Sequence, residues 1–523
     1  MPDNKKNTSN LSLLMLSFIL SVFGATVFHS MRFVWVFFTP NLKFAGGSIG
    51  LLVFMLVIIC AITALLFVSA YKPDSISDKK PCSIFIRVLF VISVLIAAAM
   101  LAVIVFAGRE TGTVLEMYLR RDIFYPGIFS LVVLLITVFP LLPLKKMAAV
   151  ALVGIISFSL LCFKKAFPVF PFCITSDPCV FDTGEDYSVV FASNYPGTAY
   201  VEYKYEGMDY KVYAQNNGRR ITDRNIHSVN VPYEHLKNNN YTVGSTMVIG
   251  DYSYGSRLGK TVIKGPYSFN SPEGEKQKYL VVSDWHTYLK QAYSAISNIK
   301  DYDAIIFMGD PAPGMDFEEE AVKYIVEFGG KITGGKMPII YVRGNHETRG
   351  SFAPYLADYL GYDKFYYTVD RGEYSFIVLD SGEDKEDVHI EYGSLDDYAV
   401  SRVQMIEWLE SLNLNNNKVI ALSHAWQVSE PEPDLSYRAF DSFARLGVRF
   451  EISGHTHECR FRDGANDQEK DYLQKYPGIT TYIDGGISGK NYIASVITLD
   501  KDGVLFEAYD NTGNKVMNKN LNW

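Results

Sequence analysis

Five long apolar runs in the first 165 residues constrain the fold of this chain more than any other feature. They lie at 11–38, 49–71, 84–107, 123–142 and 147–163. The core of a bilayer requires about 20 mostly apolar residues per helix. We therefore predict a membrane domain at 1–165 with about five transmembrane helices. A cleavable signal peptide would explain only the first run, which lacks a clear small-residue cleavage site.

The charges divide at the same boundary. Residues 1–165 carry 15 Lys and Arg against 6 Asp and Glu, a net charge of +9, and the rest of the chain carries 34 against 51, a net charge of −17. A basic apolar part followed by an acidic polar part indicates a membrane anchor that carries a polar head. The acidic head also argues against nucleic-acid binding, which depends on Lys and Arg contacting phosphates.

Basic residues in the short loops between the runs predict the orientation of the anchor. Eight Lys and Arg residues fall on the N-terminal side of the five spans and seven on the other side. This count favours a cytoplasmic N-terminus and an extracytoplasmic head. The sequence shows no eukaryotic targeting signal, so we expect a bacterial plasma membrane. His29, Arg32 and Arg87 lie near span ends, which favours anchoring over transport.

A linker and a β-rich segment follow the apolar runs. The predicted linker, 166–185, contains Cys173 and Cys179, which either form a small disulfide in an oxidising compartment or remain two unrelated thiols. From 186 to 271, short alternating stretches are separated by turn signals such as Asn217-Gly218. Regularly spaced short strands with such turns predict a small antiparallel β sandwich.

In the remaining part of the chain, polar clusters follow buried apolar strands. We predict such strands at 279–283, 304–308, 338–342, 419–422 and 448–452. The residues that follow them are, in order, Asp284 and His286, Asp310, Asn345 and His346, His424, and His455 and His457. Ligand sites in α/β sheets form at the carboxyl ends of the strands, so we expect these five clusters to meet.

The residue types and spacings in these clusters are typical of a metal site. Residues i and i+2 of an extended segment point the same way, so Asp284 and His286 can face one point, and so can His455 and His457. Glycines at 309, 344 and 454 permit tight turns or a close approach of the backbone. Imidazole, carboxylate and amide ligands suit Mn, Fe or Zn. Five of the nine histidines fall in these clusters, which scattered histidines would not do.

In combination, the motifs resemble those of the calcineurin-like metallophosphoesterase superfamily over about 278–509. They are Asp284-x-His286, Gly309-Asp310, Gly344-Asn345-His346-Glu347, His424 and Gly454-His455-x-His457. The resemblance implies an α/β four-layer sandwich of two mixed sheets flanked by helices. The sandwich at 186–271 is similar, in strand pattern and position, to the fibronectin-like domain that precedes the catalytic domain of purple acid phosphatases. The predicted order is thus an α-helical transmembrane anchor, a small all-β sandwich, the metallophosphoesterase sandwich and a tail at 510–523.

Carried over motif by motif, the resemblance implies a pair of metal ions. One ion is assigned to Asp284, His286 and His457, and the other to Asn345, His424 and His455. Asp310 would bridge the two ions, and His346 would act just outside them as an acid or oxyanion stabiliser. Purple acid phosphatases place a tyrosine ligand three residues after the bridging Asp, where this chain has Pro313. The identity of the ions, Mn, Zn or Fe, therefore stays open.

The predicted activity is hydrolysis of a phosphate ester by a hydroxide bound to the metal pair. His346 is predicted to assist the leaving group as a general acid. Arg349 is either a phosphate-binding residue or an ordinary solvated loop arginine. The motifs do not separate a monoesterase from a diesterase. The alternative is a membrane sensor or transport component whose head binds a ligand without turnover. The expected partners are a phosphoester substrate and the lipid bilayer.

Three further features carry smaller predictions. Glu347 is expected to orient a neighbouring group. Arg343 precedes the turn, so we expect that it does not reach a substrate. The acidic segment 383–397 is predicted to form a solvated loop. Asp502-Gly503 predicts a hairpin within 492–509 that completes the catalytic sheets.

Overall fold

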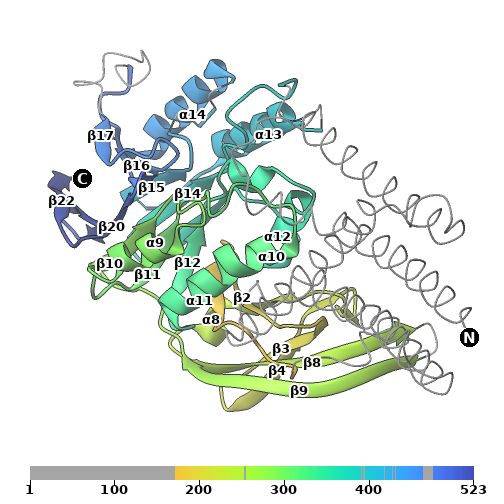
Figure 1. The fold of residues 1–523 in the computed structure, drawn as a ribbon. Helices are drawn as coiled ribbons and strands as arrows, with labels where there is room; N and C mark the ends of the chain where they lie inside the picture. The colour runs from red at the N-terminus through yellow and green to blue at the C-terminus, as the bar shows by residue number, and fades with distance from the viewer. Residues whose placement is uncertain are drawn as a thin grey trace, which may run out of the picture. The chain divides into compact units, whose positions relative to one another are not determined.

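The computed structural model describes residues 171–523 except 253–254, 390–391, 393–394, 417, 427, 430 and 463–474. The chain divides into two compact units, Met1–Pro171 and Phe172–Trp523, and the described elements belong to the second unit (Figure 1). The five predicted transmembrane helices lie outside the described residues. Within the described part of the chain, no helix is long and apolar enough to cross a membrane.

A ten-stranded mixed sheet carries three of the five polar clusters. Strands β10, β11, β12 and β1 run parallel to one another, so their carboxyl ends share one edge. The strands lie in the order β22 (Lys515–Asn522), β21 (Gly503–Asp510), β20 (Asn491–Leu499), β10 (Gln277–Val282), β11 (Ala304–Phe307), β12 (Pro338–Tyr341), β1 (Cys179–Asp182), β2 (Asp186–Ala192) and β7 (Ile226–Pro232), with β19 (Gly486–Ser488) paired to β20.

A six-stranded sheet faces the first sheet and carries the other two clusters. Its order is β13 (Tyr367–Arg371), β14 (Tyr374–Leu379), β15 (Lys418–Ser423), β16 (Val448–Ser453), β18 (Thr480–Ile483) and β17 (Arg460–Arg462). Aromatic pairs join the facing surfaces, with ring centroids 4.9 Å apart for Tyr279 and Phe376 and 5.8 Å apart for Phe450 and Phe506. The predicted strands that precede the polar clusters are confirmed, and they are buried because they lie in this double layer.

Helices cover the outer faces of both sheets and complete four layers (Figure 1). On the ten-stranded sheet lie α9 (Leu289–Ile296) and the continuous segment α10 (Glu318–Ala321), η2 (Val322–Glu327) and α11 (Phe328–Thr333). On the six-stranded sheet, α13 (Tyr398–Ser411) packs against α14 (Pro433–Leu446), which contacts β16. The short helices are α8 (Tyr233–Leu236), η3 (His346–Thr348), η4 (Ala353–Tyr355) and α12 (Leu356–Leu360). The predicted four-layer α/β sandwich is confirmed.

Helix α14 shows how the sequence sets these outer layers. Pro433 at its first turn supplies a φ angle suited to a helix start, and Gly447 ends it in a left-handed conformation. Leu435, Ala439 and Phe443 recur at four-residue spacing and are buried, so they form one apolar stripe that faces the sheet. They belong to a core shared with α13 and the outer face of the six-stranded sheet.

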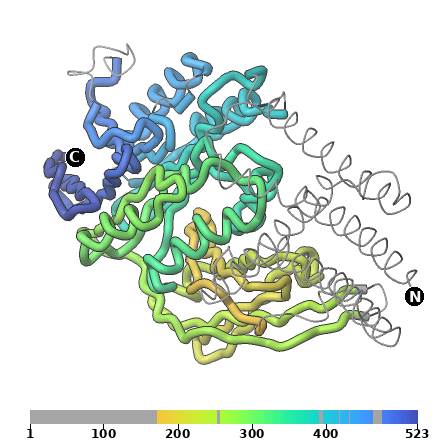
Figure 2. Tube along the Cα trace, viewed as in Figure 1, coloured from red at the N-terminus to blue at the C-terminus, as the bar shows by residue number. Residues whose placement is uncertain are grey.

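The β-rich segment forms a sandwich, as predicted, and one of its two layers belongs to the ten-stranded sheet. It contributes a four-stranded sheet in the order β4 (Met208–Tyr213), β3 (Gly197–Tyr205), β8 (Asn240–Tyr252) and β9 (Gly255–Ser268), and a small ribbon of β5 (Gln215–Asn216) and β6 (Arg219–Arg220). The facing layer is β1, β2 and β7, which belong to the ten-stranded sheet. Val189 and Val229 of that layer pack in one core with Val201 and Val243 of the other. The β-rich region and the region that carries the polar clusters therefore share one continuous sheet. Figure 2 shows the course of the chain through both regions.

Two segments expected to lack regular structure form strands. Residues 179–182, within the predicted linker, form β1 between β12 and β2, and the predicted tail forms β22 at the sheet edge. The hairpin around Asp502 is confirmed as β20 and β21. No disulfide joins Cys173 and Cys179. The Cys179 thiol donates to the Val326 carbonyl at 3.1 Å, and burial raises its pKa.

Candidate metal centre

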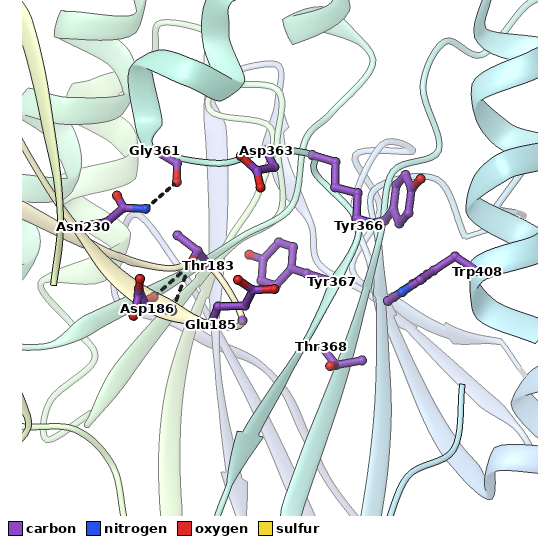
Figure 3. A pocket seen from close by; sticks show the side chains of 12 residues that line it. Thr183, Glu185, Asp186, Asn230, Gly361, Asp363, Tyr366, Tyr367, Thr368 and Trp408 are labelled. Carbon is purple, nitrogen blue, oxygen red and sulfur yellow. Dashed lines mark hydrogen bonds between the residues drawn. The ribbon is translucent and has the colours of Figure 1, made fainter. Parts of the chain in front are cut away.

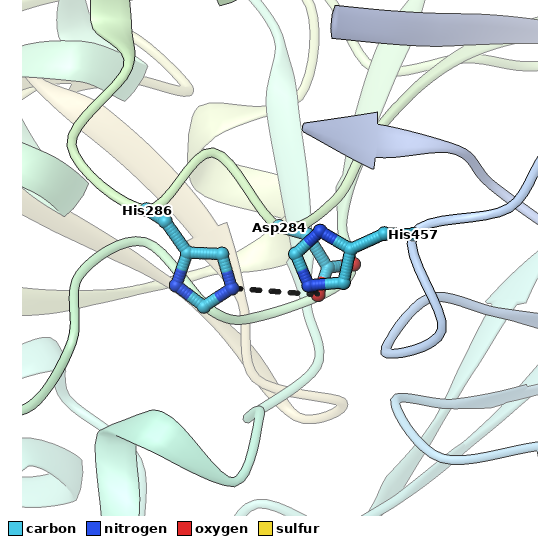
Figure 4. A group of neighbouring side chains, drawn as sticks. All are labelled: Asp284, His286 and His457. Carbon is cyan, nitrogen blue, oxygen red and sulfur yellow. Dashed lines mark ion pairs between the residues drawn. The ribbon is translucent and has the colours of Figure 1, made fainter. Parts of the chain in front are cut away.

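The five polar clusters converge at the carboxyl ends of the strands. Three side-chain groups have potential ligand atoms within 4.8 Å of one another: Asp284, His286 and His457; His286, Asp310 and His346; and Asp310, His424 and His455. Figure 4 shows the first group, in which the two imidazoles and the carboxylate face one another. The structure thus brings together residues from five loops that span 174 positions of sequence, as the strand-end pattern predicts.

The first group leaves an oxygen that a cation would satisfy. Asp284 Oδ1 is buried and has no hydrogen-bond partner among the described residues. It lies 3.5 Å from His457 Nε2 and 3.8 Å from His286 Nε2. Burial lowers the pKa of His286 to about 4, although Asp310 and Asp284 oppose the shift. A neutral imidazole beside an unsatisfied carboxylate oxygen is the donor set that a metal ion requires.

The group of Asp310, His424 and His455 shows a related mismatch at the neighbouring Asn345. As placed, the amide oxygen of Asn345 faces only acceptor atoms of His424, His455 and Asp310. Turned over, the amide nitrogen would donate to His424 Nε2 at 3.2 Å and to Asp310 Oδ2 at 3.3 Å. A cation would satisfy the same atoms with the amide oxygen facing inward. These residues therefore fit a second ion.

Asp310 lies at the middle of the centre. Its Oδ2 atom is 3.3 Å from His424 Nε2, 3.6 Å from His286 Nε2 and 3.7 Å from His346 Nε2. Burial would raise the pKa of Asp310, but His424 and His346 lower it well below its ordinary value. Conversely, burial would lower the pKa of His424, but Asp310 raises it to about 10. The site thus favours positive charge beside Asp310.

Backbone carbonyls orient the histidines through the opposite ring nitrogen. Nδ1 of His424 contacts the Met308 carbonyl, and Nδ1 of His457 contacts the Ile487 carbonyl. An Nδ1–H that donates to a carbonyl leaves Nε2 with its lone pair directed at the centre, as metal-binding histidines require. His346 uses the Pro313 carbonyl in the same way, at 3.0 Å. The position that departs from purple acid phosphatases therefore supports His346 through its backbone.

The backbone geometry differs from the extended conformation expected for the paired motifs. Asp284, His286, Asp310, His455 and His457 have φ angles of 49°, 34°, 59°, 70° and 57°. These left-handed values turn the chain at each ligand, so the side chains converge through tight turns and not through strand alternation. Such conformations are costly for residues other than glycine and persist where the surrounding structure enforces them.

The predicted role of the glycines is confirmed. A Cβ atom on Gly344 would lie 2.2 Å from Asp310 Oδ1, and one on Gly454 would lie 1.9 Å from Ser283 Oγ. Both distances are far below van der Waals contact. Glycine is required at these positions because a loop backbone passes directly against a ligand side chain.

Glu347 supports Asp310 from behind. Its fully buried carboxylate accepts from the Asp310 N–H at 2.9 Å, the Gly344 N–H at 3.1 Å and the Tyr341 hydroxyl at 2.9 Å. Burial and the nearby Asp310 raise its pKa to about 7. The structure therefore gives Glu347 the orienting position expected for it.

The two arginines of this loop are both held by carboxylates. Arg343 donates to Asp380 at 3.1 and 2.6 Å and is turned away from the centre, as expected. Arg349 lies beside the centre, with its Nη1 3.5 Å from His346 Nδ1. It is not a solvated loop residue, because Glu383 accepts from its Nε and Nη2 at 2.6 and 2.8 Å.

Glu383 is the residue that sequence reasoning missed. The segment 383–397 was expected to be solvated, but the Glu383 side chain is fully buried and also accepts from Thr348 Oγ1 at 2.7 Å and Tyr392 OH at 2.6 Å. The high acidic content of this segment conceals a single residue that turns inward. No local pattern marks Glu383, because its partners Arg349 and Thr348 lie 34 and 35 positions away.

A separate hollow lies between the β1–β2 turn, the start of β13 and the last turn of α13 (Figure 3). It is lined by Thr183, Gly184, Glu185, Asp186, Asn230, Gly361, Asp363, Lys364, Tyr366, Tyr367, Thr368 and Trp408. This lining contains no histidine or cysteine. The nitrogen donors that define the candidate metal centre are therefore confined to the loops described above.

Comparison with known proteins agrees with this geometry. Residues 277–459 match the family model for calcineurin-like phosphoesterase, a range that contains all seven predicted ligands. This part of the chain therefore resembles the calcineurin-like phosphoesterase family. No curated protein matches the sequence.

Similar solved structures include the structure of PhoD (12% identity, covering 67% of this chain and 94% of that one, TM-score 0.42). A metallophosphoesterase from Sphaerobacter thermophilus is 14% identical, covers 46% of this chain and 90% of that one, and has a TM-score of 0.23. GAP50 of Plasmodium, described as the anchor in the inner membrane complex, is also 14% identical, covers 48% and 89%, and has a TM-score of 0.33.

Proposed function

We propose that this chain hydrolyses phosphate esters at a centre of two metal ions. Asp284, His286 and His457 would hold one ion, Asn345, His424 and His455 the other, and Asp310 both. The observation that carries the proposal is the convergence of these side chains around the buried Asp310 carboxylate. When bound, such a pair of ions activates water and neutralises phosphoryl oxygens.

The residues of the chain would then position and protonate the substrate. His346 is a quarter exposed, and Pro313 holds its Nδ1 at 3.0 Å. In its protonated form, His346 keeps Nδ1–H on the Pro313 carbonyl and holds a second proton at Nε2, 3.7 Å from Asp310 Oδ2. That second proton can pass to the oxygen of the leaving group. General-acid assistance of this kind contributes about 10²–10⁴-fold in rate.

The test uses the purified full chain, loaded in turn with Mn, Zn or Fe. We expect bound metal and turnover of a chromogenic phosphoester by the wild type. Asp310→Asn should reduce turnover at least about 10³-fold and lower the metal content, with little change in thermal unfolding. A wild-type protein that binds metal but hydrolyses no phosphoester would support the alternative, a head that binds a ligand without turnover. Unchanged turnover by Asp310→Asn would refute the assignment of the site.

We further propose that the apolar runs at 1–165 anchor the enzyme in a bacterial plasma membrane with the catalytic domain outside. The supports are their length and the change from a basic to an acidic net charge at their end. Alkaline washing of membranes should leave the chain in the pellet, and protease added to intact spheroplasts should digest the catalytic domain. Release by the wash, or protection from protease, would contradict this proposal.

A further inference from the structure

The loop that carries Asn345 and His346 contains two arginines, and acidic residues offset both. Arg343 and Asp380 form a buried pair with 12% and 8% of their side chains exposed. Arg349 is bound at two nitrogen atoms by Glu383 and at Nη2 also by Asp384, at 3.3 Å. A carboxylate that binds a guanidinium through two parallel hydrogen bonds leaves little net charge for another anion.

Arg349 is the arginine whose charge matters for a substrate. It is partly exposed, and its Nη1 lies 3.5 Å from His346 Nδ1. The hydroxyl of Thr348, the preceding residue, lies within hydrogen-bond distance of both the Asn345 carbonyl at 2.6 Å and Glu383 Oε1 at 2.7 Å. The same short segment therefore contains a metal ligand, the proposed acid and this arginine.

The carboxylates cannot easily leave Arg349. The Glu383 side chain is fully buried and is fixed by Tyr392 OH at 2.6 Å as well as by Thr348. Burial would raise the pKa of Asp384, but Lys385 and Arg349 lower it to about 2, so this second carboxylate is ionised. An ion pair held in this way persists when a substrate arrives, because breaking it would leave a buried charge without a partner.

We infer that the site selects phosphodiesters over phosphomonoesters, an inference that rests on the proposed function and names its substrate class. A phosphomonoester dianion carries one more negative charge and one more terminal oxygen than a phosphodiester. An uncompensated arginine beside the centre would stabilise that extra charge. Here Glu383 already offsets Arg349, and Asp384 is shared between Arg349 at 3.3 Å and Lys385 at 2.8 Å. The monoanionic diester is therefore the better match in charge.

The test compares kcat/KM for bis(p-nitrophenyl) phosphate and p-nitrophenyl phosphate on the metal-loaded full chain in slightly alkaline buffer. The wild type should prefer the diester. Glu383→Gln removes the charge that offsets Arg349, so the ratio should move toward the monoester by about tenfold. The matched control is Glu410→Gln. Glu410 pairs with Arg438 in the same two-bond manner, at 2.7 and 2.8 Å, on the surface of α13 and α14, and its loss should leave the ratio unchanged.

A binding measurement supplies a readout that does not depend on turnover. Calorimetric titration with phenylphosphonate, a dianion, and diphenyl phosphate, a monoanion, should show tighter binding of the monoanion by the wild type. Glu383→Gln should reverse or narrow the difference. If Glu383→Gln does not fold, Asp384→Asn should shift both measurements in the same direction by a smaller factor.

The outcomes separate the two claims. Hydrolysis of neither ester, with metal bound, would overturn the proposed function, and the binding preference would still decide the charge argument. A wild-type preference for the monoester, or ratios that Glu383→Gln and Asp384→Asn leave unmoved, would overturn the inference while leaving a phosphoesterase.

Discussion

At the scale of single residues, the centre depends on buried carboxylates that need not bind metal. Glu347 fixes the backbone beside Asp310, and Glu383 fixes Arg349. Each accepts several hydrogen bonds in the interior, where losing one partner leaves other groups unsatisfied at a cost of about 1–3 kcal/mol each. The positions of the ligands are thus set by residues that contribute no ligand atom of their own.

Another buried acid, Glu451 on β16, predicts a dependence of stability on pH. Burial raises its pKa from 4.5 to about 8, and only one of its oxygens has a hydrogen-bond partner among the described residues, Thr481 Oγ1 at 2.7 Å. Between these pH values the unfolded chain releases the proton and the folded chain keeps it. The free energy of unfolding should therefore fall as pH rises across this window and level off above it.

Glu451→Gln mimics the protonated acid and should remove that slope. Compared with the wild type, it should unfold at a higher urea concentration above about pH 8, with a gain on the order of a few kcal/mol, and the gain should shrink toward acidic pH. Glu410→Gln, at an exposed acid whose pKa Arg438 lowers, should show no such gain. A constant difference between Glu451→Gln and wild type at every pH would contradict the argument.

The residue scale also shows what the sequence could predict. Histidine, carboxylate and amide side chains are among the few residue types that bind metals, so Asp310 and His424 can be recognised beside their strands. Glu383 could not be, because it resembles its exposed acidic neighbours and its role depends on a long-range contact with Arg349. Glu347 also acts through another residue, but it stands within the Gly344-Asn345-His346-Glu347 motif and could be predicted.

At the scale of elements, the strands were predictable and the turns between strand and ligand were not. A buried strand is visible as an apolar run, as in β11 (Ala304–Phe307). The left-handed backbone at Asp284 and His457 depends on neighbouring loops that crowd the same edge. The direction in which a ligand side chain points is therefore decided by packing among loops and not by local periodicity.

That crowding makes one glycine critical. A Cβ at position 454 would lie 1.9 Å from Ser283 Oγ and 2.6 Å from Asp284 Oδ2, so Gly454→Ala must displace the Asp284 carboxylate. We expect a loss of stability of about 1–3 kcal/mol, weaker metal binding, and a fall in kcat of about 10²-fold.

The matched control is Gly478→Ala, where the nearest atom, Arg449 Nη1, is 3.7 Å from the added Cβ. Metal titration, phosphoester turnover and urea unfolding of both variants provide the measurement. Equal behaviour of the two variants would show that the Gly454 loop can shift without disturbing Asp284.

At the scale of the whole molecule, the β-rich region and the catalytic domain share one sheet. The change in strand pattern predicts a β sandwich before the catalytic domain, but pattern does not reveal that β1 pairs in parallel with β12 and antiparallel with β2. Four residues are too few to give a periodic signal. Their position was set by pairing with β12, whose residues lie about 160 positions later.

This arrangement predicts where the catalytic part can be cut. A fragment of residues 186–523 lacks β1 and Asp182, whose side chain forms a buried ion pair with Arg371. Leaving Arg371 buried without its partner costs about 3–5 kcal/mol, and β12 and β2 lose the strand between them.

A fragment that begins at 171 keeps both features. In thermal unfolding and gel filtration, we expect 171–523 to be monodisperse with one sharp transition. The 186–523 fragment should aggregate or unfold at a much lower temperature. Comparable behaviour of the two fragments would mean that β1 is dispensable.

The parallel pairing of β1 with β12 also has a mechanical consequence. Val180, Phe181 and Asp182 align with the three residues at the start of β12, and the loop that follows β12 carries Asn345. Tension applied to the chain at its entry to β1 would act along the strand and load this row of hydrogen bonds in shear, not one bond at a time. Through these hydrogen bonds, such a force would be transmitted from β1 to β12, the strand that leads into the loop of Asn345.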